Sequence, residues 1–201
     1  MGLVIFDRSG SMDGGWTQEG DADAGVDVSK WQAASDALLG ALDPVQYRVT
    51  LGAIFFPQPE ECAVAPIEDR RQVAFQAGPD FIATWRAVAP LNGPGGSTPL
   101  GAALVLGEQA IEGACLQGLL ERRFFVMVVT DGMPNCDTDM TAAAAIVAKW
   151  SEHGIETYVI GLPGSEGATF VLDALAKAGG TETIVVPGSP SELEDDMGAM
   201  M

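Results

Sequence analysis

One short stretch near the start of the chain constrains the fold more than any other. Residues 3–6 form an unbroken apolar run, and Asp7 follows it directly, with Ser9 and Ser11 at alternate positions after it. Such a run is typical of a strand that is buried on both faces of a parallel sheet. Because ligands of open α/β sheets bind at the carboxyl ends of the strands, we expect Asp7 to lie at a ligand-binding edge.

The side chains of this stretch offer hard oxygen atoms. Asp7, Ser9 and Ser11 each carry one or two, and Gly10 between the serines permits a tight turn that brings them together. Hard oxygens suit a hard cation, Mg²⁺ first, with Ca²⁺ or Mn²⁺ as alternatives. A second interpretation needs no metal: Asp7 caps the following turn, and the serines bind loop amides.

Apolar and turn-forming segments alternate along the rest of the chain. Further strands are predicted at 47–56, 72–76, 123–130, 155–162 and 183–186. Helices are predicted between Ser29 and Asp43, at 81–88, 100–112, 140–153 and 169–178, and from Ser191. The alternation predicts an α/β fold, a doubly wound, Rossmann-like, mostly parallel six-stranded sheet with helices on both faces. Residues 72–76 are its short antiparallel edge strand, residues 1–190 form the domain, and residues 191–201 form a short acidic C-terminal helix or tail.

Two later segments bring more oxygen donors to the same edge. Asp131 follows the very apolar strand 123–130, and Thr98 ends a glycine-rich loop that opens a helix. If strands 3–6 and 123–130 lie side by side, then five donors converge, namely Asp7, Ser9, Ser11, Thr98 and Asp131. The loop lacks the lysine of a phosphate-binding loop. The sequence therefore predicts a cation site with room for an outside ligand.

The charge of the chain limits its partners. The formal net charge is −18, from 28 acidic and 10 basic residues, which argues against nucleic acid or an anionic membrane as a partner. No apolar run approaches the ~18 residues of a membrane span. The acidic loop 13–27 contains Asp21, Asp23 and Asp27, but it lacks the spacing of an EF-hand, so a solvated loop is favoured over a second ion site.

These motifs together resemble those of the von Willebrand factor type A domain family. The resemblance rests on Asp7-Arg8-Ser9-Gly10-Ser11, on Thr98 in Gly95-Gly96-Ser97-Thr98-Pro99, and on Asp131 in Thr130-Asp131-Gly132. It implies a metal-ion-dependent adhesion site in which Ser9, Ser11 and Thr98 are hydroxyl ligands, while Asp7 and Asp131 bind directly or through water. Phe55-Phe56-Pro57, Cys62 and residues 130–136 further resemble bacterial surface and secreted members.

The resemblance implies a function without catalysis: a protein-binding or adhesion module whose Mg²⁺ meets a Glu or Asp of a protein partner. One alternative is a Mg²⁺-dependent phosphohydrolase, but Ser9 stands where that chemistry needs a second Asp, and Lys149 and Lys177 fall within helices. His153 is predicted at a helix end on the far side of the sheet, which does not support a hydrolytic triad. Another alternative is an intracellular module that acts beside an ATPase or chelatase.

Three cysteines bear on the compartment. In the predicted topology the loops with Cys62 and Cys136 both lie at the carboxyl end of the sheet, whereas Cys115 lies at the opposite end. We therefore expect a Cys62–Cys136 disulfide, which implies an extracellular, cell-surface or periplasmic location for a monomeric domain of a larger protein. The alternative is three reduced cysteines in a cytoplasmic protein.

Overall fold

The computed structural model describes the chain except for residues 17–27, 59, 61, 89–96, 119–122 and 137–139. The described residues build a five-stranded sheet with the strand order β3-β2-β1-β4-β5. Its strands are β1 (Gly2–Asp7), β2 (Thr50–Phe56), β3 (Val73–Ala77), β4 (Phe125–Thr130) and β5 (Glu156–Gly161). β1 pairs in parallel with β2 and β4, β5 pairs in parallel with β4, and β3 runs antiparallel to β2. The predicted α/β fold with an antiparallel edge strand is confirmed.

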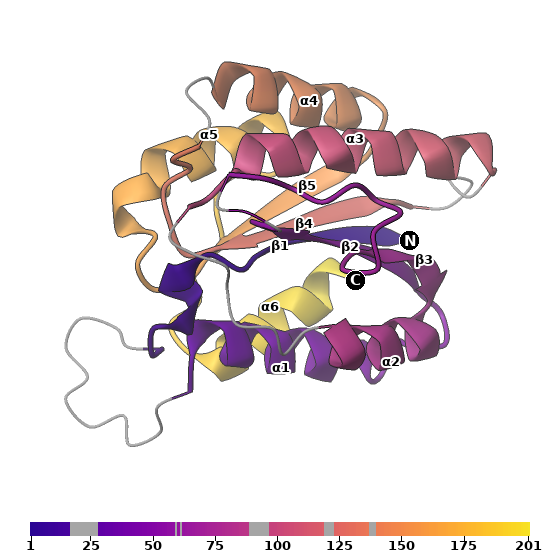
Figure 1. Ribbon diagram of the computed structural model, residues 1–201, viewed down its shortest axis with the longest axis horizontal. Helices are drawn as coiled ribbons and strands as arrows, with labels where there is room; N and C mark the ends of the chain where they lie inside the picture. The colour runs from indigo at the N-terminus through magenta and orange to yellow at the C-terminus, as the bar shows by residue number, and fades with distance from the viewer. Residues whose placement is uncertain (17–27, 59, 61, 89–96, 119–122, 137–139) are drawn as a thin grey trace.

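Helices cover both faces of this sheet, as Figure 1 shows. On one face lie α1 (Lys30–Leu42), α2 (Gly78–Val88) and α6 (Pro190–Met200). On the other face lie α3 (Leu100–Leu116), α4 (Met140–Glu152) and α5 (Thr169–Ala178). Side chains of β1 alternate between the two cores, since Val4 and Phe6 pack toward α1, whereas Leu3 and Ile5 pack toward α3. A central strand buried on both faces explains the apolar run at the start of the chain.

The predicted sixth strand, at 183–186, is not found among the described residues. Only Val185 pairs there, through a parallel bridge to Ile160 beside β5. Asp173 of α5 binds the segment instead, because its Oδ1 accepts hydrogen bonds from the Thr183 hydroxyl at 2.6 Å and from the Ile184 amide at 3.3 Å. Pro187 then follows and has no amide hydrogen to offer a ladder. The expected strand is therefore reduced to one bridge.

The end of the chain belongs to the packed structure. Ser189 caps α6 by accepting a hydrogen bond from the Glu192 amide at 3.2 Å, and Leu193, Met197 and Met200 are buried in the core that α1 shares. None of the helices in the described ranges is both long and apolar enough to cross a membrane. The prediction of a solvated acidic loop, rather than a second ion site, is not tested, since Asp21, Asp23 and Asp27 lie outside the described residues.

Candidate metal site

The candidate site lies where β1 and β4 end. Asp7 is the last residue of β1, and its side chain is 0% exposed. Its Oδ1 accepts a hydrogen bond from the Ser9 amide at 2.7 Å, and its Oδ2 accepts one from the hydroxyl of Thr130, the last residue of β4, at 2.5 Å. Both carboxylate oxygens are thus held by the protein, and Asp7 ties the ends of two neighbouring strands together.

Burial governs the acidity of Asp7. Loss of solvent raises its pKa from 3.8 to about 6, although the hydrogen bonds from Thr130 and Ser9 oppose this rise, and the nearby Asp131 carboxylate adds to it. A carboxylate in such surroundings lacks compensating positive charge. A bound cation would supply that charge.

A short chain of oxygen contacts joins β1 to the loop that follows β4. The Ser9 and Ser11 hydroxyl oxygens lie 3.1 Å apart, and the Ser11 hydroxyl donates to Asp131 Oδ1 at 2.7 Å. Ser9 and Asp131 are buried, whereas Ser11 is exposed, so the chain of contacts opens to solvent at Ser11. The tight turn that carries Ser11 is a short 3₁₀ helix (Gly10–Asp13), and Gly10 does not have a positive φ in it.

Thr98 approaches this group from the start of α3. It is buried, and its amide donates to Asn135 Oδ1 at 2.7 Å, while the Asn135 amide donates to the Thr98 carbonyl oxygen at 3.4 Å. Asn135 stands four residues after Asp131, so these bonds fasten Thr98 to the loop that carries the second carboxylate. The structure thus links Asp7, Ser9, Ser11 and Asp131 through direct contacts, and Thr98 through Asn135.

Lys30 is a member of this group that the sequence analysis missed. It is the first residue of α1 and is only 8% exposed. Its ammonium group forms an ion pair with Asp131 Oδ2 and donates to the carbonyl oxygen of Pro163 at 2.8 Å. One oxygen of Asp131 therefore faces a hydroxyl, and the other faces a buried cation.

The predicted disulfide borders the site. Cys62 and Cys136 are bonded, with their Cα atoms 5.6 Å apart, and the bridge joins the loop after β2 to the loop that carries Asp131. The third cysteine, Cys115, lies near the end of α3, where it is exposed and forms no disulfide. Both parts of the cysteine prediction are confirmed.

The donor set has the chemistry of a hard-cation site. The described residues contain no cluster of three or more His, Cys, Asp or Glu side chains, so a zinc-like site does not occur in the part of the chain that the structure describes. Neighbouring oxygens around a six-coordinate Mg²⁺ with bonds near 2.0–2.1 Å stand roughly 3 Å apart. The distance of 3.1 Å between the Ser9 and Ser11 hydroxyl oxygens and the distance of 2.7 Å from the Ser11 hydroxyl to Asp131 Oδ1 are close to that spacing.

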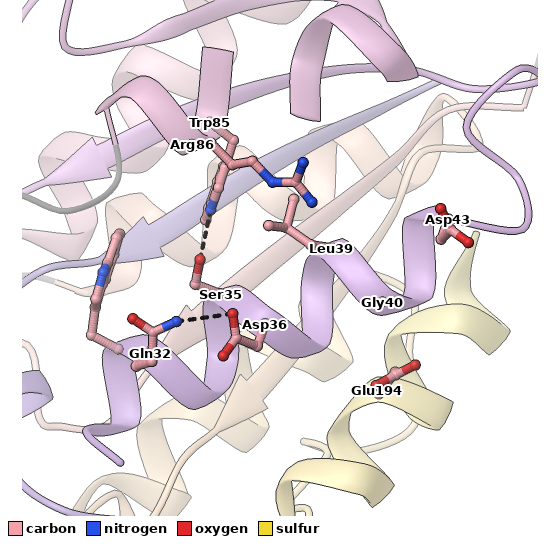
Figure 2. Close-up of a pocket in the computed structure, with 10 residues that line it drawn as sticks. Gln32, Ser35, Asp36, Leu39, Gly40, Asp43, Trp85, Arg86 and Glu194 are labelled. Atoms are coloured by element: carbon pink, nitrogen blue, oxygen red, sulfur yellow. Dashed lines mark hydrogen bonds between the residues drawn. The ribbon is translucent and has the colours of Figure 1, made fainter. Parts of the chain in front are cut away.

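A separate hollow lies between α1, α2 and α6. Its volume is about 630 Å³, and Figure 2 shows the side chains that line it. Trp85 lines it and donates from Nε1 to Ser35 Oγ at 2.8 Å, while Gln32 donates to Asp36 Oδ1 at 2.9 Å. Four of the lining side chains are thus paired with one another, and none of the five predicted oxygen donors lines this hollow.

Comparisons with known proteins support the fold. No family model matches the chain, and a search of curated proteins finds no match. Among solved structures, the PilB minor pilin from Streptococcus sanguinis is similar, with a TM-score of 0.69, 16% identity, and coverage of 99% of this chain and 60% of the pilin. A von Willebrand factor type A protein from Catenulispora acidiphila gives a TM-score of 0.63, 20% identity, and coverage of 99% and 41%.

A third similar structure is a single domain of comparable size. The SpRpn10 VWA domain gives a TM-score of 0.65 at 11% identity, and the match covers 97% of this chain and 93% of that domain. By contrast, this chain spans about 60% or less of the pilin and of the Catenulispora protein. The layered sheet, its strand order and these matches together show that the chain has the fold of von Willebrand factor type A domains.

Proposed function

We propose that this chain is a metal-dependent protein-binding module. The hydroxyls of Ser9, Ser11 and Thr98, together with the carboxylates of Asp7 and Asp131, would hold Mg²⁺, with Ca²⁺ or Mn²⁺ as alternatives. The observation that carries the proposal is the run of oxygen contacts from Ser9 through Ser11 to Asp131, at the carboxyl ends of two adjacent parallel strands. When bound, the ion would supply a positive position that an outside carboxylate can complete.

The way the carboxylates are held favours an acidic partner. Both oxygens of Asp7 accept hydrogen bonds within the protein, and one oxygen of Asp131 is paired with Lys30. The protein therefore offers mainly neutral hydroxyl oxygens and leaves most of the ion's charge uncompensated. A Glu or Asp side chain of a protein partner suits such a site, whereas the overall charge of −18 disfavours nucleic acid.

The alternative function is a Mg²⁺-dependent phosphohydrolase. Such an enzyme needs a lysine at its site, and Lys30 is a lysine at this site. Asp7 is nevertheless unsuited to be the nucleophile of such an enzyme. It is fully buried, and both of its oxygens are engaged by Ser9 and Thr130. A nucleophile must reach the substrate with a free oxygen, so we propose a binding module without turnover.

The disulfide supports a location outside the cytoplasm. Structural disulfides persist in oxidising compartments, and here the Cys62–Cys136 bond joins two loops beside the site. Similarity to a minor pilin is in keeping with an extracellular or surface module that is a monomeric domain of a larger protein. The alternative is an intracellular module that acts beside an ATPase or chelatase.

Thermal unfolding with and without MgCl₂ tests the proposal. A ligand that binds only the folded state stabilises it by about 2.7 kcal/mol at a hundred times its Kd, so the melting temperature should rise with Mg²⁺. Ser9→Ala and Asp131→Asn should lose this increment, because each removes an oxygen of the chain of contacts.

The matched control is Asp195→Asn, which removes one exposed negative charge from α6. It should keep the full response to Mg²⁺. Equal stabilisation of the wild type and all three variants would refute the proposal, because it would indicate only general screening of the negative charge.

A further inference from the structure

A buried lysine at the candidate metal site is the feature that the proposed function does not explain. Lys30 reaches Asp131 from the start of α1, and both its backbone amide and its ammonium group are held by hydrogen bonds. Its amide donates to the Gly14 carbonyl oxygen at 2.9 Å, and its ammonium group donates to the Pro163 carbonyl oxygen at 2.8 Å. The segments after β1 and β5 thus hold the two ends of this residue.

The loop after β5 leaves room for the ammonium group only because it contains a glycine. Gly164 has a φ of +104°, and a Cβ atom built there would lie 3.1 Å from Lys30 Nζ and 3.1 Å from the Asp131 carbonyl oxygen. A side chain at this position would therefore crowd the ion pair. Lys30, Asp131 and Gly164 together form a close-fitting arrangement rather than a chance surface contact.

The ion pair changes the charge that the site presents. Asp7 and Asp131 contribute two negative charges, and the ammonium group of Lys30 cancels one of them. The ammonium group also occupies Asp131 Oδ2, so only Oδ1, which faces Ser11, remains directed at the other oxygen donors. A divalent cation at these donors would therefore meet a net charge of minus one in place of minus two.

We propose that Lys30 is a positioning residue that weakens the affinity of the site for a divalent cation alone and thereby makes tight binding depend on an added carboxylate. The inference rests on the proposed function. In the metal-free protein Lys30 holds Asp131 in place, and in the loaded protein it leaves a positive charge that only an outside anion balances. Lys30 therefore couples metal binding to partner binding.

Isothermal titration calorimetry with MgCl₂ alone tests this role. Lys30→Met removes the charge and keeps a similar length, so it should tighten Mg²⁺ binding at least about tenfold, because a like charge close to the ion is lost. Lys30→Arg keeps the charge and should stay within about threefold of the wild type. The matched control Lys149→Met removes an equal charge from an exposed lysine of α4, and it should leave the affinity within about twofold.

A carboxylate probe tests the coupling itself. At constant ionic strength, sodium acetate should tighten Mg²⁺ binding to the wild type and have a smaller effect on Lys30→Met. If Lys30→Met does not fold by circular dichroism, Lys30→Gln replaces it. If neither variant folds, the Mg²⁺ affinity of the wild type is compared with and without acetate. An affinity that acetate does not change would contradict the coupling.

The outcomes separate this inference from the proposed function. If the wild type binds Mg²⁺ and Lys30→Met binds it equally or more weakly, the inference is wrong and the proposed function stands, because a merely structural lysine gives that result. If only Lys30→Met binds Mg²⁺ alone and acetate brings about binding to the wild type, both the inference and the proposed function hold. If acetate does not bring about that binding, the coupling and the proposed function are both overturned. If no variant binds Mg²⁺, both are overturned.

Discussion

Replacement of Asp7 by asparagine should stabilise the metal-free protein. Burial raises the pKa of Asp7 from 3.8 to about 6, so above pH 6 the folded state holds a charge that the unfolded chain accommodates more easily. The difference of about two pKa units corresponds to about 3 kcal/mol of lost stability at pH 7.5, at 1.36 kcal/mol per unit. A neutral asparagine removes this cost.

The side chain of asparagine can also keep the local hydrogen bonds. Its Oδ1 can accept from the Ser9 amide as Asp7 does, and its amide group can donate to the Thr130 hydroxyl in place of the present bond in the opposite direction. Since this exchange does not fully reproduce the original pair, we expect Asp7→Asn to gain about 1–3 kcal/mol at pH 7.5.

The sign of the pH dependence follows from the raised pKa. The folded state binds the Asp7 proton more tightly than the unfolded state does, so the cost of the charge grows as the pH rises from about 4 to about 6 and is complete above that range. The advantage of Asp7→Asn should therefore shrink to less than about 1 kcal/mol at pH 4.

Urea denaturation in EDTA at pH 7.5 and pH 4 measures both values, with Asp195→Asn as the exposed control. A variant that is less stable than the wild type at pH 7.5 with an unchanged m-value would refute the reasoning, because it would show that the Asp7 charge is compensated without a metal. The same variant should show no stabilisation by Mg²⁺, so that stability and metal response change in opposite directions.

Other predictions concern the surroundings of the site. The double variant Cys62→Ser, Cys136→Ser opens a loop with a sequence separation of 74 and should lose about 4 kcal/mol in urea denaturation, whereas Cys115→Ser should be close to neutral. Gly164→Ala should cost about 1–3 kcal/mol, because a φ of +104° disfavours a side chain, and it should also change the response to Mg²⁺. Hydrolysis of p-nitrophenyl phosphate should stay at the background rate with Mg²⁺, and activity that Asp7→Asn abolishes would restore the phosphohydrolase alternative.

The strands and helices of the fold were predictable where the pattern of the sequence is local. The apolar run of β1 and the helical spacing in α1 each appear within a few residues, and both elements form where the pattern predicts them. The segment 183–186 also has a strand pattern, but its backbone is held by Asp173 of α5. Competition of this kind depends on tertiary packing, which a local pattern does not contain.

The residues of the site also fall into those that a local pattern predicts and those that it does not. Asp7, Ser9, Ser11 and Asp131 were predictable because each follows a buried strand, and the order of the strands brings their ends together. Thr130 and Asn135 were overlooked, although each adjoins a motif that was considered, because threonine in a strand and asparagine in a turn have ordinary structural roles there.

Lys30 carried one signal that sequence analysis could have used. It occupies the first position of α1, where the partial positive charge of the helix end disfavours a cation. A buried lysine at such a position requires an anion from another element, and among the residues of the site Asp131 supplies it. The net charge of −18 therefore gives a poor account of the charge at the site, because the ammonium group of Lys30 is paired with one of its two carboxylates. Only two of the 28 acidic residues belong to the site, so its affinity for a cation depends on the few oxygens that Lys30 leaves unpaired rather than on the total charge.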